Sequence, residues 1–146
     1  MPRYFTLPQA EKLLPEVESA IRDAIAAKSE FEHAETEWQG FSSRVTLLGG
    51  VRVDHSEVSH LKSRRESSAR QLKDAVEKIQ ECGCLLKDLD MGLIDFPTLL
   101  RGEEVYLCWK LGESGIQFWH GVHEGYRGRK AIDQDFLAHH RGEETQ

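Results

Sequence analysis

The chain has 146 residues, a net charge of −6, and charged and apolar fractions of 30% and 39%. This length is typical of one domain. The acidic balance excludes nucleic-acid binding over the whole surface, because such binding needs many basic side chains. The pair Arg64-Arg65 is too short for a local basic patch, so we expect no nucleic-acid partner.

No stretch of the sequence approaches the run of about 18 apolar residues that a membrane helix needs. The N-terminal residues Met1-Pro2-Arg3-Tyr4 also lack the apolar segment of a secretion signal. The cysteines at positions 82, 84 and 108 are odd in number and match no disulfide framework. These features predict a cytoplasmic protein in a reducing compartment, without membrane association.

A long helix is expected to begin near residue 6. Thr6-Leu7-Pro8-Gln9 is a capping-box sequence, which predicts a helix start. Pro15 removes one helical hydrogen bond and predicts a kink or restart near Leu14-Pro15-Glu16. Beyond it a heptad pattern continues until Gly49-Gly50. Its positions are Leu14, Val17, Ile21, Ala24, Lys28, Phe31, Glu35, Trp38, Ser42 and Val45.

A second helix is expected to begin at Asp54-His55-Ser56-Glu57 and to end at Gly83. Its heptad positions are Val58, Leu61, Arg65, Ser68, Leu72, Ala75, Ile79 and Cys82. Two such helices joined by a short loop pack antiparallel, which places Glu35 near Arg65 and Ser68. These polar residues are then either a salt-bridged part of the seam, or a device that sets the register or accepts a partner helix.

Short strands follow the helices. Segments rich in Leu, Ile, Val and aromatic residues alternate with turn residues, and connections this short allow only antiparallel neighbours. The expected strands are residues 84–90, 93–96, 103–111 and 116–120. The predicted fold class is therefore α+β: a long antiparallel two-helix, coiled-coil-like hairpin followed by a small antiparallel β-meander of three to four strands.

The sequence divides into one domain and a tail. We expect a single domain over residues 1–130, composed of the helical hairpin (6–83), the β-meander (84–120) and a loop rich in Gly and Arg (121–130). Residues 131–146 are predominantly polar, so we expect a weakly ordered C-terminal tail.

Several blocks resemble the bacterial family catalogued as domain of unknown function 2203. The blocks are FTL at residues 5–7, LLP at 13–15, LKDLDMGLIDFP at 86–97, EVYLCWKLGE at 104–113, FWH at 118–120 and GYRGR at 125–129. The resemblance covers nearly the whole chain. It implies a bacterial, cytoplasmic, stand-alone domain and supplies no activity. His123 is not part of the family pattern, which weakens any site that requires it.

The densest group of functional side chains lies between Trp119 and Arg129. His120, His123 and Glu124 offer two imidazoles and a carboxylate, a ligand set that suits a divalent metal such as zinc, iron or nickel. Asp88, Asp90 or Asp95 can complete such a shell. The alternative is that His120 is a structural, hydrogen-bonded histidine, because the spacing matches no closed zinc motif.

Two further arrangements could carry chemistry. Asp95 interrupts an apolar run and is expected to face Lys110, so it is either an acid–base carboxylate acting with His120 and Glu124, or one half of an ion pair. Arg127 and Arg129 lie in a glycine-flanked loop and are either an anion clamp or a tie to acidic residues. Trp119 is a further ligand-binding candidate, and Cys108 is expected to be a core or interface thiol.

Two functions follow from these features. The first is a non-enzymatic interaction or regulatory module that forms a homodimer through the helical hairpin. It rests on the long heptad seam and on a mixed sheet face bearing Tyr106, Lys110 and Trp119. The alternative is a small metal- or anion-dependent enzyme or ligand-binding protein, with a His/Asp/Arg site at the base of the hairpin.

Overall fold

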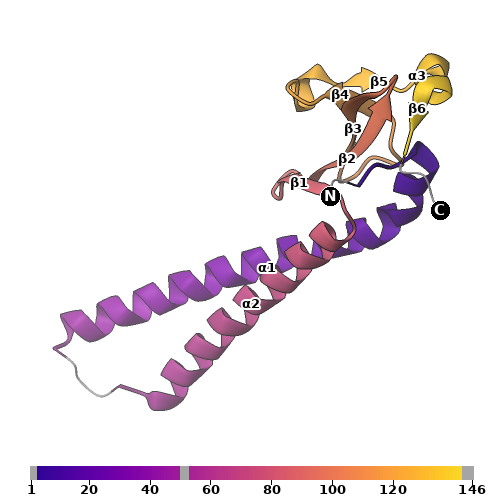
Figure 1. Cartoon of the computed structure of the whole chain (residues 1–146). Coiled ribbons are helices and arrows are strands. Elements are labelled where there is room, and N and C mark those ends of the chain that lie inside the picture. The colour runs from indigo at the N-terminus through magenta and orange to yellow at the C-terminus, as the bar shows by residue number, and fades with distance from the viewer. Residues whose placement is uncertain (1–2, 50–52, 143–146) are drawn as a thin grey trace. The chain divides into compact units, whose positions relative to one another are not determined.

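The computed structural model describes residues 3–49 and 53–142 (Figure 1). No helix in this described part of the chain is long and apolar enough to cross a membrane. The elements, in chain order, are α1 (Leu7–Leu47), α2 (His55–Glu81), β1 (Leu85–Asp88), β2 (Leu93–Leu100), β3 (Glu103–Lys110), β4 (Phe118–Gly121), the 3-10 helix η1 (Tyr126–Gly128), β5 (Lys130–Ala131), α3 (Gln134–His139) and β6 (His140–Arg141).

The described chain divides into two compact units. The first unit contains the described residues up to 21 together with those from 76 onward. It therefore holds the whole sheet, the start of α1 and the end of α2. The second unit is residues 22–75, the remaining part of the helical hairpin. The boundary between the two units falls within both helices, since the unit with the sheet contains only the first part of α1 and the last part of α2.

The start of α1 is the predicted capping box. The Gln9 amide donates to the Thr6 hydroxyl at 3.2 Å, and the Thr6 amide donates to the Gln9 side chain at 2.9 Å. The expected restart at Pro15 is absent, since α1 continues through it to Leu47. Proline removes one hydrogen bond there, while Leu14 and Val17 on either side are buried and hold the segment in place.

In the second unit, α1 and α2 run side by side in opposite directions (Figure 1). Buried positions recur every seven residues along each helix, at Ala27, Ala34 and Phe41 on α1 and at Leu61, Ser68 and Ala75 on α2, and four of these six side chains are small. The three α2 residues belong to the predicted seam, whereas the predicted α1 positions Phe31, Glu35 and Trp38 are only half-buried.

Ion pairs fix the register of this hairpin. Arg65 Nε lies 2.6 Å from Glu35 Oε2, which confirms the predicted proximity of these residues. Arg64 reaches both Glu30, at 2.7 Å, and Glu37. Such exposed pairs add little to stability, but together they link neighbouring turns of the two helices and define one antiparallel alignment.

The sheet is an antiparallel meander of strand order β1-β2-β3-β4-β5, with β6 paired to β2. The predicted fold class, a helical hairpin followed by an antiparallel meander, is thereby confirmed. The sheet is larger than the three to four strands expected. Its extra members, β5 and β6, are two residues each, too short to show the alternation by which a strand is recognised.

The strand β2 passes through Pro97, where the sequence suggested a break. The Pro97 carbonyl accepts a hydrogen bond of 2.8 Å from the Phe5 amide, so this backbone position faces the strand edge away from β3. β1 pairs with residues 93–95 of that edge and β6 with residues 99–100. Proline is tolerated because its missing N–H falls between these two ladders.

Residues 131–142 are ordered rather than the weakly ordered tail that we expected. Asp133 caps α3, its side chain accepting a hydrogen bond of 2.8 Å from the Phe136 amide. Phe136 is buried and stacks against Trp119, with ring centroids 5.2 Å apart. The Asp133 cap and the buried Phe136 ring therefore hold this segment, which ends in β6, in place. The remaining tail residues, 143–146, lie outside the described residues.

Replacing Ala34 with leucine tests the packing of α1 against α2. Ala34 is fully buried, so added methylenes must push the helices apart, and we expect a loss of about 1–3 kcal/mol in the free energy of unfolding. Ala26→Leu is the matched control, because Ala26 is exposed on the same helix and its replacement should stay within about 0.5 kcal/mol. Urea unfolding followed by circular dichroism measures both. Equal stability of the two variants would contradict this packing.

Candidate metal centre

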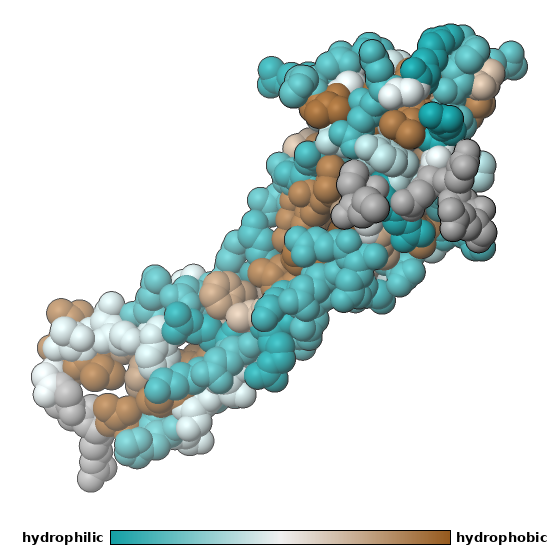
Figure 2. Space-filling view, viewed as in Figure 1, coloured by the Kyte–Doolittle hydropathy of each residue, from teal (hydrophilic) through white to brown (hydrophobic). Residues whose placement is uncertain are grey.

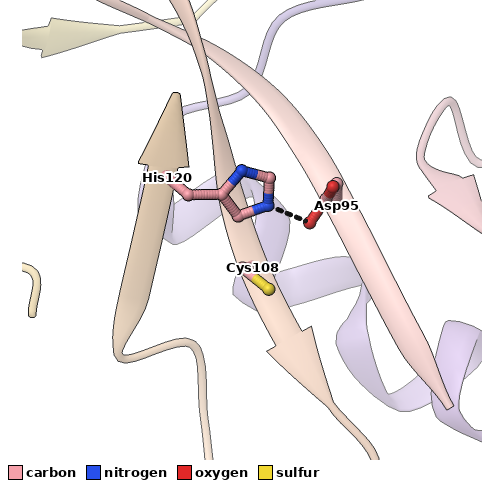
Figure 3. Close-up of side chains that lie close together, drawn as sticks. All are labelled: Asp95, Cys108 and His120. Carbon is pink, nitrogen blue, oxygen red and sulfur yellow. Dashed lines mark hydrogen bonds and ion pairs between the residues drawn. The ribbon is translucent and has the colours of Figure 1, made fainter. Parts of the chain in front are cut away.

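Three buried side chains converge on one face of the sheet. Asp95 on β2, Cys108 on β3 and His120 on β4 point toward one another (Figure 3). Their ligand atoms all lie within 4.8 Å of one another. The exposed fractions are 1%, 0% and 3% respectively, so the group is shielded from solvent.

Strand register brings these residues together. Asp95 pairs directly with Cys108 across β2 and β3, and His120 lies on β4 opposite Tyr106. Residues opposite one another in adjacent strands share a face, as do residues two apart along a strand. His120 therefore shares the face of Cys108, and its ring reaches back to Asp95 on β2.

The hydrogen bonds of His120 define the role of each ring nitrogen. Nδ1 lies 2.8 Å from the Gly121 carbonyl oxygen, which can only accept, so Nδ1 carries a proton and donates. Nε2 lies 3.0 Å from Asp95 Oδ1. In a neutral imidazole this Nε2 has a free lone pair, which would repel a carboxylate oxygen. A second proton on the imidazole, a proton on the Asp95 carboxyl group that is donated to Nε2, or a metal cation bound to both side chains removes that repulsion.

The state of Cys108 excludes a nucleophilic role in this conformation. Burial, reinforced by the negative charge of Asp95, raises the pKa of the Cys108 thiol to about 12, and the nearby Arg129 guanidinium opposes this rise. A protonated thiol is a poor nucleophile, and a side chain without exposed surface cannot meet a substrate. A metal cation, by contrast, can displace the thiol proton.

The group can hold a metal ion. Imidazole nitrogen, thiolate sulfur and carboxylate oxygen are the three zinc ligand types, with bonds of about 2.0 Å to nitrogen and oxygen and about 2.3 Å to sulfur. The contact from Nδ1 to the Gly121 carbonyl is the outer contact that orients a metal-bound histidine. Among the described residues, Asp95, Cys108 and His120 form the group of potential metal ligands that the fold brings together.

Arg129 lies beside this centre. Its guanidinium stacks over Phe118 at 4.0 Å and over Tyr126 at 4.8 Å, and its terminal nitrogen contacts Glu113 Oε2 at 2.6 Å. Phe118 pairs with Cys108 across β3 and β4. The expected tie between this loop and an acidic residue is therefore present, and it places a positive charge next to the Asp95, Cys108 and His120 group.

His123 and Glu124 lie on an exposed turn rather than in the buried group. The Glu124 carboxylate accepts from the Gly121 amide at 2.8 Å and from Lys130 at 2.8 Å. These two contacts, Lys130 first, lower the pKa of Glu124. Glu124 thus stabilises the turn that follows β4, and the structure brings His120 to Asp95 and Cys108 instead.

The remaining candidates are separate from the centre. Trp119 pairs with Leu107 and packs on Phe136, so it lies on the sheet face opposite His120 and away from Tyr106. Arg127 is exposed on η1. Asp95 pairs with His120 instead of the expected Lys110, because the register sets Lys110 opposite Leu93.

Cys108 is the member of the group that sequence reasoning missed. Its mid-strand position suggested a core thiol, yet the alternation that placed Asp95 on the face of Lys110 also places Cys108 there, two residues from Lys110. That signal was present in the sequence. The pairing of Asp95 with Cys108, rather than with another residue of β3, needed the register.

Comparison with known proteins identifies a family without an activity. A family model described as "Uncharacterized conserved protein (DUF2203)" matches residues 3–132, nearly the whole chain, and confirms the resemblance found in the sequence. No curated protein matches the chain, and no solved structure does.

The three cysteines should resist alkylation in the folded chain. Burial raises the pKa of Cys84 to about 12, as it does for Cys108, and it also raises the pKa of Cys82. The reactive thiolates of Cys84 and Cys108 then form only near that strongly alkaline range, and the thiolate of Cys82 forms only at a pH above its ordinary range. At mildly alkaline pH we expect mass spectrometry to detect almost no iodoacetamide adducts on the native chain and three on the urea-unfolded chain. Rapid modification of native Cys84 or Cys108 would contradict this burial.

Proposed function

Because this chain belongs to the DUF2203 family, whose description supplies no activity, we propose a function from its own geometry: it is a metal-binding protein. The centre is formed by Asp95, Cys108 and His120. This proposal develops the metal-dependent alternative that the sequence offered, with Asp95 and Cys108 in place of His123 and Glu124.

The observation that carries the proposal is the orientation of the His120 ring. With Nδ1 donating to the Gly121 carbonyl, Nε2 is directed at the Asp95 carboxylate, beside the Cys108 thiol. A metal ion satisfies all three groups at once, because each offers a lone pair to the same small space. A second proton on the imidazole satisfies the His120–Asp95 contact as a buried ion pair, and the Cys108 thiol then hydrogen-bonds to Asp95. The metal differs from this arrangement because it binds one lone pair from each of the three groups.

Zinc fits this ligand set best. The set mixes one sulfur, one nitrogen and one oxygen ligand, which suits zinc better than magnesium or calcium, both of which prefer oxygen ligands alone. Three protein ligands are typical of zinc centres at which a further ligand binds. Burial of the whole group also restricts access of bulk water.

Metal analysis and ligand replacement test the proposal. We expect protein purified without chelators to contain close to one zinc per chain. Zinc added to the metal-free chain at about a hundred times its dissociation constant should stabilise the fold by about 2.7 kcal/mol, because only the folded state assembles the site. Cys108→Ala and His120→Gln should remove both effects.

His123→Gln is the matched control, because His123 lies exposed on the following turn. This variant should bind zinc as the natural chain does. Loss of zinc from the His123 variant would favour the original set of His120, His123 and Glu124. If the protein contains no bound metal and no divalent cation raises its unfolding temperature, the metal proposal is refuted. The His120–Asp95 contact is then a buried ion pair.

A second function is favoured by the helical hairpin: homodimerisation, as an interaction or regulatory module of a bacterial, cytoplasmic protein. Figure 2 shows apolar side chains gathered at the loop end of the hairpin, where Leu47 and Leu48 are 84% and 63% exposed. Phe31 and Trp38 are half-buried on the second unit. Two helices alone form a single layer, and a second copy would complete a four-helix bundle.

Charge on this surface suits a second copy of the same chain. A groove beside Phe31 is lined by Lys62, Arg65, Glu66 and Ala69, which supply both signs of charge. A two-fold axis sets identical surfaces against each other, so a patch carrying both signs can complement itself. A partner with a single sign of charge would fit such a patch less well.

Sedimentation velocity tests the dimer. We expect the natural chain to sediment as a dimer at tens of micromolar, and the double variant Phe31→Glu/Trp38→Glu as a monomer, because buried carboxylates cost free energy at an apolar interface. Glu32→Gln is the control on an exposed neighbouring position and should remain dimeric. A clean monomer for the natural chain would remove this proposal.

A further inference from the structure

The Arg129 side chain carries a buried donor that the fold leaves unused. Only 9% of the side chain is exposed, and its Nε has no hydrogen-bond partner among the described residues. Its terminal nitrogen, in contrast, is paired with Glu113. Buried donors are nearly always satisfied, so an unused one indicates that a ligand or an ordered water accepts from it.

Arg129 is held rigidly in this position. The Glu113 carboxylate that binds it also accepts from the Lys110 amide at 2.6 Å, and the Glu113 carbonyl accepts from the Trp109 indole at 3.2 Å. The guanidinium is further stacked over Phe118. Because Glu113 and Phe118 restrain it, a hydrogen bond from Nε costs little side-chain entropy.

The donor lies next to the candidate metal centre. Phe118, which the guanidinium covers at 4.0 Å, is the cross-strand neighbour of Cys108. A cationic donor and a metal with three protein ligands then share one face of the sheet, where a negatively charged ligand is attracted by both.

We propose that Arg129 Nε donates to a small carboxylate anion that binds as the fourth ligand of the metal held by Asp95, Cys108 and His120. This inference rests on the proposed metal centre and adds the chemical class of its ligand. Nε offers a single N–H, which suits one oxygen of a carboxylate while the other contacts the metal. Because the three ligands are almost fully buried, formate and acetate are the carboxylates with which we test the site.

Cobalt(II) replacing zinc provides the readout, because its visible bands respond to the fourth ligand and its thiolate charge-transfer band reports an occupied centre. We expect formate and acetate to shift the visible bands of the natural chain saturably. Arg129→Lys and Arg129→Gln should weaken this anion binding by roughly tenfold to a hundredfold, the value of one charge-assisted hydrogen bond. Arg127→Gln, an exposed neighbour, should bind as the natural chain does.

Three results would overturn the inference, and they are distinguishable from one another. If neither anion alters the cobalt bands, the metal centre is still supported and the proposed anion ligand is refuted. If both Arg129 variants bind the anion as tightly as the natural chain does, Arg129 Nε has no role in anion binding. Loss of the thiolate band in both Arg129 variants, but not in Arg127→Gln, would make Arg129 a support of the metal site itself. Absence of any cobalt band in the natural chain would instead refute the metal centre.

Discussion

The register of β2, β3 and β4 is the constraint on which the candidate site depends. Each antiparallel pairing sets one residue opposite another, and a shift of a single residue would turn every side chain to the other face of the sheet. With the observed pairing, Asp95 meets Cys108 and His120 completes the group. The apolar face behind them, with Phe96 and Leu107 fully buried, resists such a shift because it would expose core side chains to polar surroundings.

The polar groups on the site face are supported by neighbouring contacts. Asp95, Cys108 and His120 are all almost fully buried. The Gly121 carbonyl orients the His120 imidazole, and Glu113 holds Arg129 beside Phe118. Buried polar groups are costly unless each is satisfied. The proposed metal centre would give these three buried groups a use beyond stability.

The two compact units rely on different physics. The unit that contains the sheet is stabilised by large aromatic and aliphatic side chains, such as Trp109 and Phe136. The hairpin unit buries mainly alanine and serine in its middle, with Ala34 and Ser68 as examples. Small residues bury little apolar area, so the hairpin gains less from its own core. Half-buried aromatic side chains on its surface leave area that a second copy can cover.

Sequence alone determined the local features of this protein, because each depends on residues close together in the chain. The capping box at Thr6, the N-cap at Asp54, the helix end at Gly83 and the meander follow from such short-range chemistry. Only the tertiary structure decided the rest. Asp95 and His120 are 25 residues apart, the small-residue seam depends on how closely two helices approach, and Phe136 docks α3 through a contact with Trp119. Contacts over such separations depend on strand register and packing, which no local pattern specifies.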